Sequence, residues 1–231
     1  VLLAPLYAIR PAAEWLILTQ ALAISITAWP LYLLGRRVLS SEHGSLLWSL
    51  AFLFNPFVLN AAAWDFQSVT LAAPLMALAM LALEMRRGGL MLLSCLILLL
   101  VREHFGLAVV GFGVLWWLRQ RTALPALLSI GMGTLGFILV LGVIMPALSP
   151  VGTHVMLNGD LGQLSRYAWL GTSPVEVMFS LLRNPIDAVR IVILDLEGWL
   201  YIVMLLLPLA AVPLVGMEFL LPAGADLAAN L

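Results

Sequence analysis

Long apolar runs, separated by short polar turns, constrain this chain more than any other feature of its sequence. They cover residues 1–9, 13–37, 45–63, 67–85, 88–101, 104–118, 123–147 and 198–216. Hydrophobic residues make up 63% of the chain and charged residues 10%, whereas soluble domains carry about 25% charged residues. Because a single globular core could not bury this much apolar surface, lipid must solvate part of it. We therefore predict an all-α, polytopic bundle of about seven to eight transmembrane helices.

The apolar pattern predicts one transmembrane domain over residues 1–231. The chain begins at Val1 without an initiator methionine and ends at Leu231, and we expect both apolar ends to be cuts through a larger protein. One long interruption, at 148–197, is expected to be a non-cytoplasmic loop. The single cysteine, Cys95, excludes an intrachain disulfide and a cysteine-based metal cluster, and the net charge of −1 gives no electrostatic footprint for nucleic acid.

The arginines orient the predicted helices. Three pairs follow the second, fourth and sixth apolar runs: Arg36 and Arg37, Arg86 and Arg87, and Arg119 and Arg121. These loops hold six of the eleven arginines, and alternating passes place them on one side, which the positive-inside rule makes cytoplasmic. The turns Trp64–Gln67 and Arg102–His104 and the segment 148–197 then face outward. We expect a multi-pass protein of the inner (plasma) membrane.

The two apolar runs on either side of Arg102-Glu103-His104 are short. Each has roughly 14–15 residues, or about 21 Å of helix, against about 30 Å of hydrocarbon. One continuous helix over 88–118 would bury the three polar side chains at mid-membrane, where each charge costs at least about 2.5–3.5 kcal/mol. The sequence therefore predicts two short helices that meet at an outward-facing charged elbow.

The segment 148–197 carries signals for two amphipathic helices. Ser173-Pro174-Val175-Glu176 is a capping box with proline at the first helical position, so a helix should begin there. Asn184-Pro185 should end that helix and begin the second one. Because each predicted helix has one apolar face, we expect this two-helix segment to lie on the membrane surface or to cover the bundle.

Motifs typical of soluble enzymes are missing from the sequence. It contains no G-x-x-x-x-G-K-S/T phosphate loop, no G-x-S-x-G elbow and no H-E-x-x-H. Gly111-x-Gly113 and Gly131-x-Gly133 lie inside apolar runs, where glycine permits close packing of helices. Candidate chemistry must therefore come from polar residues at the helix ends.

Polar side chains gather at two outward turns. Asp65 lies between two aromatic residues, with Gln67 at the start of the next run, and Arg102-Glu103-His104 forms the other turn. Ionisable groups in such places are costly unless they are paired, hydrated or functional. Ion pairs between Arg102 and Asp65 or Glu103 are the structural alternative to contact with a substrate or a metal.

Two further readings of the polar residues stay open. Asp65, Glu103 and His104 together offer hard ligands for a divalent cation, although their spacing does not require one. In the long outer segment, Arg166-Tyr167 suits a phosphate clamp or stacking on a sugar, and an ordinary loop ion pair explains this arginine equally well.

Several short motifs, in order along the whole chain, resemble a bacterial and archaeal membrane family called domain of unknown function 2079. They are Leu3-Ala4-Pro5-Leu6-Tyr7, then Asp65-Phe66 followed by Leu71-Ala72-Ala73-Pro74-Leu75, then Arg102-Glu103, and finally Arg166-Tyr167 leading into Gly171-Thr172-Ser173-Pro174. That family is similar in architecture to the GT-C glycosyltransferases, integral membrane enzymes that take sugars from polyprenyl-phosphate carriers.

The resemblance implies where the chemistry lies. GT-C enzymes usually carry a catalytic Asp or Glu in the first outer loop, so we expect the main catalytic acid upstream of Val1. The family commonly has an acidic residue where this chain has His104, and no carboxylate-pair role is carried over to that position.

The resemblance therefore implies a GT-C-like glycosyltransferase that uses a polyprenyl-phosphate sugar donor at the outer face. Asp65 and Glu103 are the candidate catalytic residues, which orient acceptor hydroxyls or a metal ion. The candidate substrate-binding residues are Gln67, Arg102, His104, Arg166 and Tyr167, of which Arg102 or Arg166 would neutralise the departing lipid phosphate. The expected partners are the lipid bilayer and a polyprenyl-phosphate-linked sugar, with no nucleic acid, and no cofactor is expected, although a divalent metal stays open.

Two other functions remain as alternatives. A transporter or flippase of a lipid-linked or polar solute predicts ionisable groups deep in the membrane and helices broken at its midplane. The charges lie mostly at helix ends, but Asn55-Pro56 and the prolines Pro208 and Pro213 are candidate breaks. A non-catalytic membrane scaffold would need the charged turns only for structure.

Overall fold

The computed structural model describes residues 12–144, 147, 183, 199–200, 203–204 and 212–224. Within these residues all regular secondary structure is helical, which confirms the predicted all-α fold class. The chain divides into two compact units, residues 1–137 with 218–224 and residues 138–217 with 225–231. The first apolar run and the predicted amphipathic two-helix segment lie outside the described residues, apart from the single position 183.

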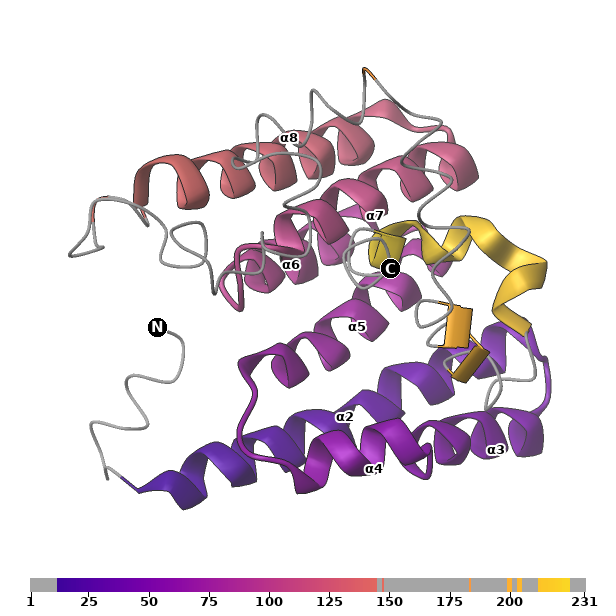
Figure 1. The fold of residues 1–231 in the computed structure, drawn as a ribbon. Helices are drawn as coiled ribbons and strands as arrows, with labels where there is room; N and C mark the ends of the chain where they lie inside the picture. Colours follow the sequence, from indigo (N-terminus) through magenta and orange to yellow (C-terminus); the bar gives the residue numbers. More distant parts are fainter. Residues whose placement is uncertain are drawn as a thin grey trace. The chain divides into compact units, whose positions relative to one another are not determined.

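The first unit is built from consecutive helices joined by short turns (Figure 1). They are α2 (Ala13–Val38), α3 (Glu42–Leu53), α4 (Pro56–Ala63), the 3₁₀-helix η1 (Ser68–Leu71), α5 (Ala72–Glu84), α6 (Gly88–Leu99), α7 (Phe105–Gln120) and α8 (Ala123–Leu139). Beyond residue 137, α8 runs into the second unit, which also holds the π-helix η2 (Val140–Ile144). The 3₁₀-helix η6 (Val212–Ala223) returns to the first unit from Glu218 onward.

The helices of the first unit pack partly against their chain neighbours and partly across the chain. Helix α2 contacts α3 on one side and α5 on the other, and α5 in turn packs against α6. The main apolar core lies among α5, α6, α7 and the start of α8, where Leu83, Met91, Phe105 and Phe112 are almost fully buried. Small residues of α5, such as Ala79 and Ala82, are also completely buried and let the neighbouring helices approach closely.

Glycines bring α7 close to α8 and to η6. A Cβ on Gly133 would lie 2.5 Å from the Gly106 carbonyl oxygen, and one on Gly113 would lie 2.8 Å from the Ala126 carbonyl oxygen. A Cβ on Gly111 would lie 2.5 Å from the Leu221 carbonyl oxygen in η6. Close packing is thus confirmed at these three glycines, whereas no such packing is seen at Gly131, because no atom of the described residues lies within 4 Å of the added Cβ.

The apolar run predicted over 45–63 does not form one helix. It is divided into α3 and α4, which are bent by 46° relative to each other, and α3 begins earlier, at Glu42. Pro56 has no N–H to donate and disfavours the helical region for the residue before it, so the helix ends at this point. Asn55 then caps α4, since its side-chain oxygen accepts a hydrogen bond from the Phe57 backbone N–H at 2.9 Å.

The predicted elbow between two short helices is confirmed. Helix α6 ends at Leu99 and α7 begins at Phe105, with a turn between them. The two helices run antiparallel, because the Trp116 ring near the end of α7 would lie 3.4 Å from a Cβ placed on Gly88 at the start of α6. The charged turn is therefore at the far end of a helical hairpin.

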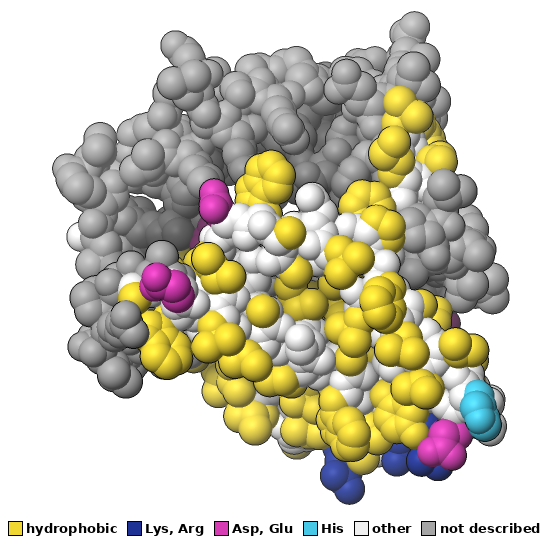
Figure 2. Space-filling view, turned by 90° about the horizontal axis from the view of Figure 1, so that it is seen from below, with side chains coloured by type: hydrophobic (Ala, Val, Ile, Leu, Met, Phe, Trp, Pro, Cys, Tyr) yellow, Lys and Arg dark blue, Asp and Glu magenta, His cyan; other side chains and the backbone are white. Residues whose placement is uncertain are grey.

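Two described helices are long and apolar enough to cross a membrane. They are Glu14–Val38 and Ala123–Ile144. The bent pair α3–α4 brings the number to three if it counts as one span, and the other apolar helices are shorter. The face formed by α2, α3 and α4 is mostly hydrophobic, with arginine and histidine side chains at one edge (Figure 2). Such a wide apolar surface is typical of contact with lipid.

Candidate functional site

The three arginine-bearing turns lie at one end of the first unit. The ends of α2 and α5 meet there, because Arg36 and Arg37 line the same hollow as Met85. The end of α7 joins them, since Arg119 forms an ion pair with Glu84 at 3.5 Å. The prediction that alternating helices bring these turns together is therefore confirmed within this unit (Figure 1).

Each of these turns contains one residue in the left-handed backbone region. Ser40, Arg86 and Arg121 have φ angles of 51°, 56° and 56°. After α5 the Arg87 N–H donates to the Ala82 carbonyl oxygen at 2.8 Å, which is the outer hydrogen bond of a Schellman motif. This C-terminal motif ends the helix sharply and leaves Arg86 and Arg87 exposed.

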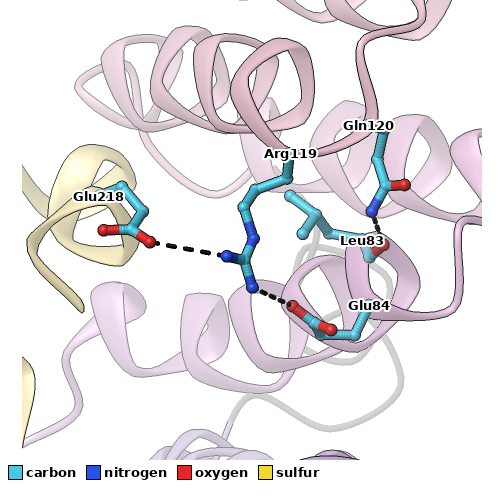
Figure 3. A network of polar contacts seen from close by, with 5 residues as sticks. All are labelled: Leu83, Glu84, Arg119, Gln120 and Glu218. Atoms are coloured by element: carbon cyan, nitrogen blue, oxygen red, sulfur yellow. Dashed lines mark hydrogen bonds and ion pairs between the residues drawn. The ribbon is translucent and has the colours of Figure 1, made fainter. Parts of the chain in front are cut away.

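Arg119 links three elements at this end (Figure 3). Its guanidinium lies 3.5 Å from the Glu84 carboxylate of α5 and 3.7 Å from the Glu218 carboxylate of η6, and it covers the Phe219 ring at 4.7 Å. The neighbouring Gln120 side chain donates to the Leu83 carbonyl oxygen at 3.0 Å. These contacts explain Arg119 as a structural residue that holds η6 against α5 and α7.

The turn with Asp65 lies at the opposite end, between α4 and η1. Trp64, Asp65 and Gln67 are exposed, and Gln67 precedes the first residue of η1. The turn is held in place by Gln20 of α2, whose side chain is completely buried. Sequence reasoning missed this residue.

Gln20 binds both sides of the turn. Its Nε2 group donates to the carbonyl oxygens of Ala61 at 2.8 Å and Trp64 at 3.3 Å, which lie where α4 ends. Its Oε1 atom accepts from the Gln67 N–H at 2.8 Å. The amide therefore satisfies backbone groups that have no partner within a helix, and it fixes the backbone on either side of Asp65.

A threonine completes this polar cluster. The Thr70 hydroxyl lies 2.7 Å from the Gln67 carbonyl oxygen and 3.3 Å from Gln20 Oε1. A hydroxyl has one proton to donate, so the shorter contact to Gln67 is the stronger of the two. Through these contacts a polar cluster inside the bundle supports an exposed carboxylate at its surface.

The second turn, Arg102–His104, lies between α6 and α7 and is half-buried. Its carbonyl oxygens accept hydrogen bonds from the first N–H groups of α7, with Phe105 donating to Arg102 at 3.3 Å and Gly106 to Glu103 at 3.1 Å. The His104 ring packs on the Phe105 ring, with 4.3 Å between their centroids, and Phe105 belongs to the core. The backbone of this turn is thus anchored to the start of α7.

The Asp65 turn and the Arg102–His104 turn lie at the end opposite the three arginine-bearing turns. Their side chains do not form the contacts expected of an ion pair or of a metal site. Among the described residues, the Arg102 guanidinium makes no ion pair with Asp65 or Glu103. Within the same residues no three His, Cys, Asp or Glu side chains are grouped as a metal site needs. Arg166 and Tyr167 lie outside the described part of the chain.

A family model described as "Predicted membrane protein (DUF2079)" matches residues 1–231. The match covers all the helices described above and confirms the resemblance suggested by the short motifs. No curated protein and no solved structure matches the chain.

Proposed function

The chain belongs to the DUF2079 family of predicted membrane proteins, and on that premise we propose that it is a membrane glycosyltransferase of the GT-C type. It transfers a sugar from a polyprenyl-phosphate carrier to an acceptor at the face that carries the Asp65 turn and the Arg102–His104 turn. In this proposal the protein is a multi-pass protein of the inner (plasma) membrane, and its arginine turns face the cytoplasm.

The observation that supports the proposal is the distribution of ionisable side chains at one end of the first unit. Asp65, Arg102, Glu103 and His104 belong to turns whose backbones are held by Gln20 and by the first N–H groups of α7. A fixed backbone limits the positions open to the side chains that bind a substrate. Asp65 is exposed and the Arg102–His104 turn is half-buried, so both turns lie at the surface of this end, where a substrate can reach them.

The proposed reaction is the displacement of a lipid phosphate. An acceptor oxygen forms a bond to the anomeric carbon of the sugar, and the bond from that carbon to the phosphate oxygen breaks with its electron pair. The proton of the acceptor hydroxyl passes to a carboxylate of the protein, which acts as the general base. Asp65 and Glu103 orient the acceptor, Arg102 offsets the charge of the leaving phosphate, and Gln67 and His104 contact the substrate.

Kinetics of the full-length protein test this proposal. Purified protein in liposomes is given polyprenyl-phosphate sugars, and glycosylated product is measured by mass spectrometry. We expect the double variant Asp65→Asn, Glu103→Gln to lose about 10²–10⁴-fold in turnover. The matched control is Glu42→Gln, because Glu42 lies exposed in the first turn of α3, at the arginine end. Unchanged turnover in the double variant contradicts the residue assignment.

One observation favours a transporter as the second candidate. The break between α3 and α4 resembles the broken helices of transporters, which form sites at the midplane. Transport of a charged solute predicts charged groups inside the bundle, whereas among the described residues no Asp, Glu, Arg or His is buried. Uptake of solute into liposomes without covalent product is the result that favours transport over the enzyme.

A further inference from the structure

A hollow opens between the C-terminal ends of α2 and α5, at the arginine end of the first unit. Its volume is about 330 Å³, and it is lined by Leu33, Arg36, Arg37, Leu81 and Met85. The hollow is shallow and open to the surface, so it suits one compact group that stays partly exposed. None of its lining residues belongs to the proposed glycosyltransferase site.

The charge of the hollow is unbalanced. Arg36 and Arg37 are exposed, and neither forms an ion pair in the part of the chain that the structure describes. The acidic residue next to Met85 is Glu84, whose carboxylate already pairs with Arg119. With two guanidinium groups and no carboxylate in its lining, the hollow attracts an anion, and the planar guanidinium fits the oxygens of a phosphate in particular.

The rest of the lining is apolar. Leu81 is 3% exposed and belongs to the buried part of α5, while Leu33 and Met85 are half-buried. Trp29 is 66% exposed and lies on the same face of α2 as Leu33 and Arg36, at helical spacings of four and seven residues. This face therefore changes from apolar to cationic over about 10 Å of helix. Its natural complement is a molecule with an anionic head and an apolar tail.

We propose that this hollow binds the phosphate headgroup of one anionic phospholipid. Arg36 and Arg37 bind the phosphate oxygens, and the acyl chains extend past Leu33 toward Trp29. Basic pockets between membrane helices are known to hold anionic headgroups on the cytoplasmic side, which is the side that the positive-inside rule assigns to these arginines. The proposal is independent of the glycosyltransferase activity.

Native mass spectrometry of the full chain tests this site. The protein is extracted from vesicles of phosphatidylcholine and phosphatidylglycerol, and the retained phosphatidylglycerol is counted. We expect Arg36→Gln, Arg37→Gln to weaken that retention about tenfold or more. The control Arg86→Gln, Arg87→Gln removes the same charge from exposed positions of the same end that do not line the hollow. Equal weakening in the control overturns the proposal, because it indicates general attraction to the membrane surface.

A second variant fills the hollow without changing its charge. Met85→Trp replaces the flexible methionine side chain in the lining with a bulkier indole ring. We expect this variant to reduce phosphatidylglycerol retention as strongly as loss of the two arginines. Unchanged retention in this variant rules out the hollow as the binding place. Inorganic phosphate added in excess should not displace the lipid, and its displacement of the lipid would overturn the assignment to a phospholipid.

Discussion

At the scale of single residues, Gln20 connects the interior of the bundle to its surface. It lies within an apolar helix, yet its hydrogen bonds reach residues that are 41 to 50 positions away in the sequence. A buried amide is tolerated in such a place only when its donors and acceptors have partners. The side chain therefore belongs to the support of the Asp65 turn and not to the packing of α2 alone.

Replacement of Gln20 by Leu should loosen this turn. The Gln67 N–H and the Ala61 carbonyl would lose their partner, and an unsatisfied buried group costs about 1–3 kcal/mol. We expect faster hydrogen exchange at the Gln67 amide and a lower free energy of unfolding in a denaturing-detergent titration. The control is Thr27→Val, since the buried Thr27 hydroxyl donates only to the Ala23 carbonyl of its own helix. An exchange rate equal to that of the control would contradict the supporting role.

The sequence predicted the two polar turns but not how they are held. Asp65 and Arg102–His104 stand out because they interrupt apolar runs, and that signal is local. Gln20 is also visible as a lone amide in a long apolar run. The partners of Gln20 cannot be recognised in the sequence, because no periodicity or spacing links a side chain in α2 to backbone groups at the end of α4 and beyond it. The ion pairs of Arg102 with Asp65 or Glu103, suggested by charge complementarity, do not form among the described residues.

At the scale of helices, close approach depends on the face on which each glycine lies. Gly133 faces Gly106 across the contact between α7 and α8, and the Ser129 hydroxyl strengthens this contact by donating to the Val109 carbonyl oxygen at 2.8 Å. Gly131 is two positions away, and a Cβ added there meets no atom of the described part of the chain within 4 Å. The chain thus offers a matched pair of glycines in one helix.

Gly133→Ala should separate α7 from α8. The added Cβ would lie 2.5 Å from the Gly106 carbonyl oxygen and 2.9 Å from the Val110 backbone nitrogen, and neither backbone atom can rotate away. We expect a loss of about 1–3 kcal/mol in the free energy of unfolding, as in other overpacked contacts. Gly131→Ala should be neutral or slightly stabilising, since alanine favours the helix and its Cβ meets no atom of the described residues. Equal effects of the two variants would contradict the packing described here.

Helix positions were predictable where hydrophobicity alone decides them. The run predicted over 13–37 is helix 13–38, and the elbow between α6 and α7 follows from the cost of charges at mid-membrane. The run over 45–63 was wrong as a single helix, although Asn55-Pro56 was already a candidate break, because hydropathy measures transfer into lipid and ignores backbone hydrogen bonding. A missing N–H at Pro56 changes the path of the chain without changing its apolar character.

At the scale of the whole molecule, the central expectation is that the two kinds of turn face opposite sides of a membrane. Single cysteines introduced on a Cys95→Ala background test it in intact cells with a membrane-impermeant maleimide. Cysteines replacing Asp65 and Glu103 should react from outside, and cysteines replacing His43 and Arg87 should react only after the cells are opened. Reaction of both pairs from outside would contradict the orientation.

The contact between Gly111 and residues 221–222 has a consequence for biosynthesis. The two partners are separated by about 110 residues, and a ribosome adds about 5–20 residues per second, so Leu221 follows Gly111 by roughly 5–20 s. During that interval α7 has been synthesised, but the residues of η6 that cover Gly111 have not. The nascent chain therefore needs temporary protection at this face from lipid, from the insertion machinery or from a chaperone.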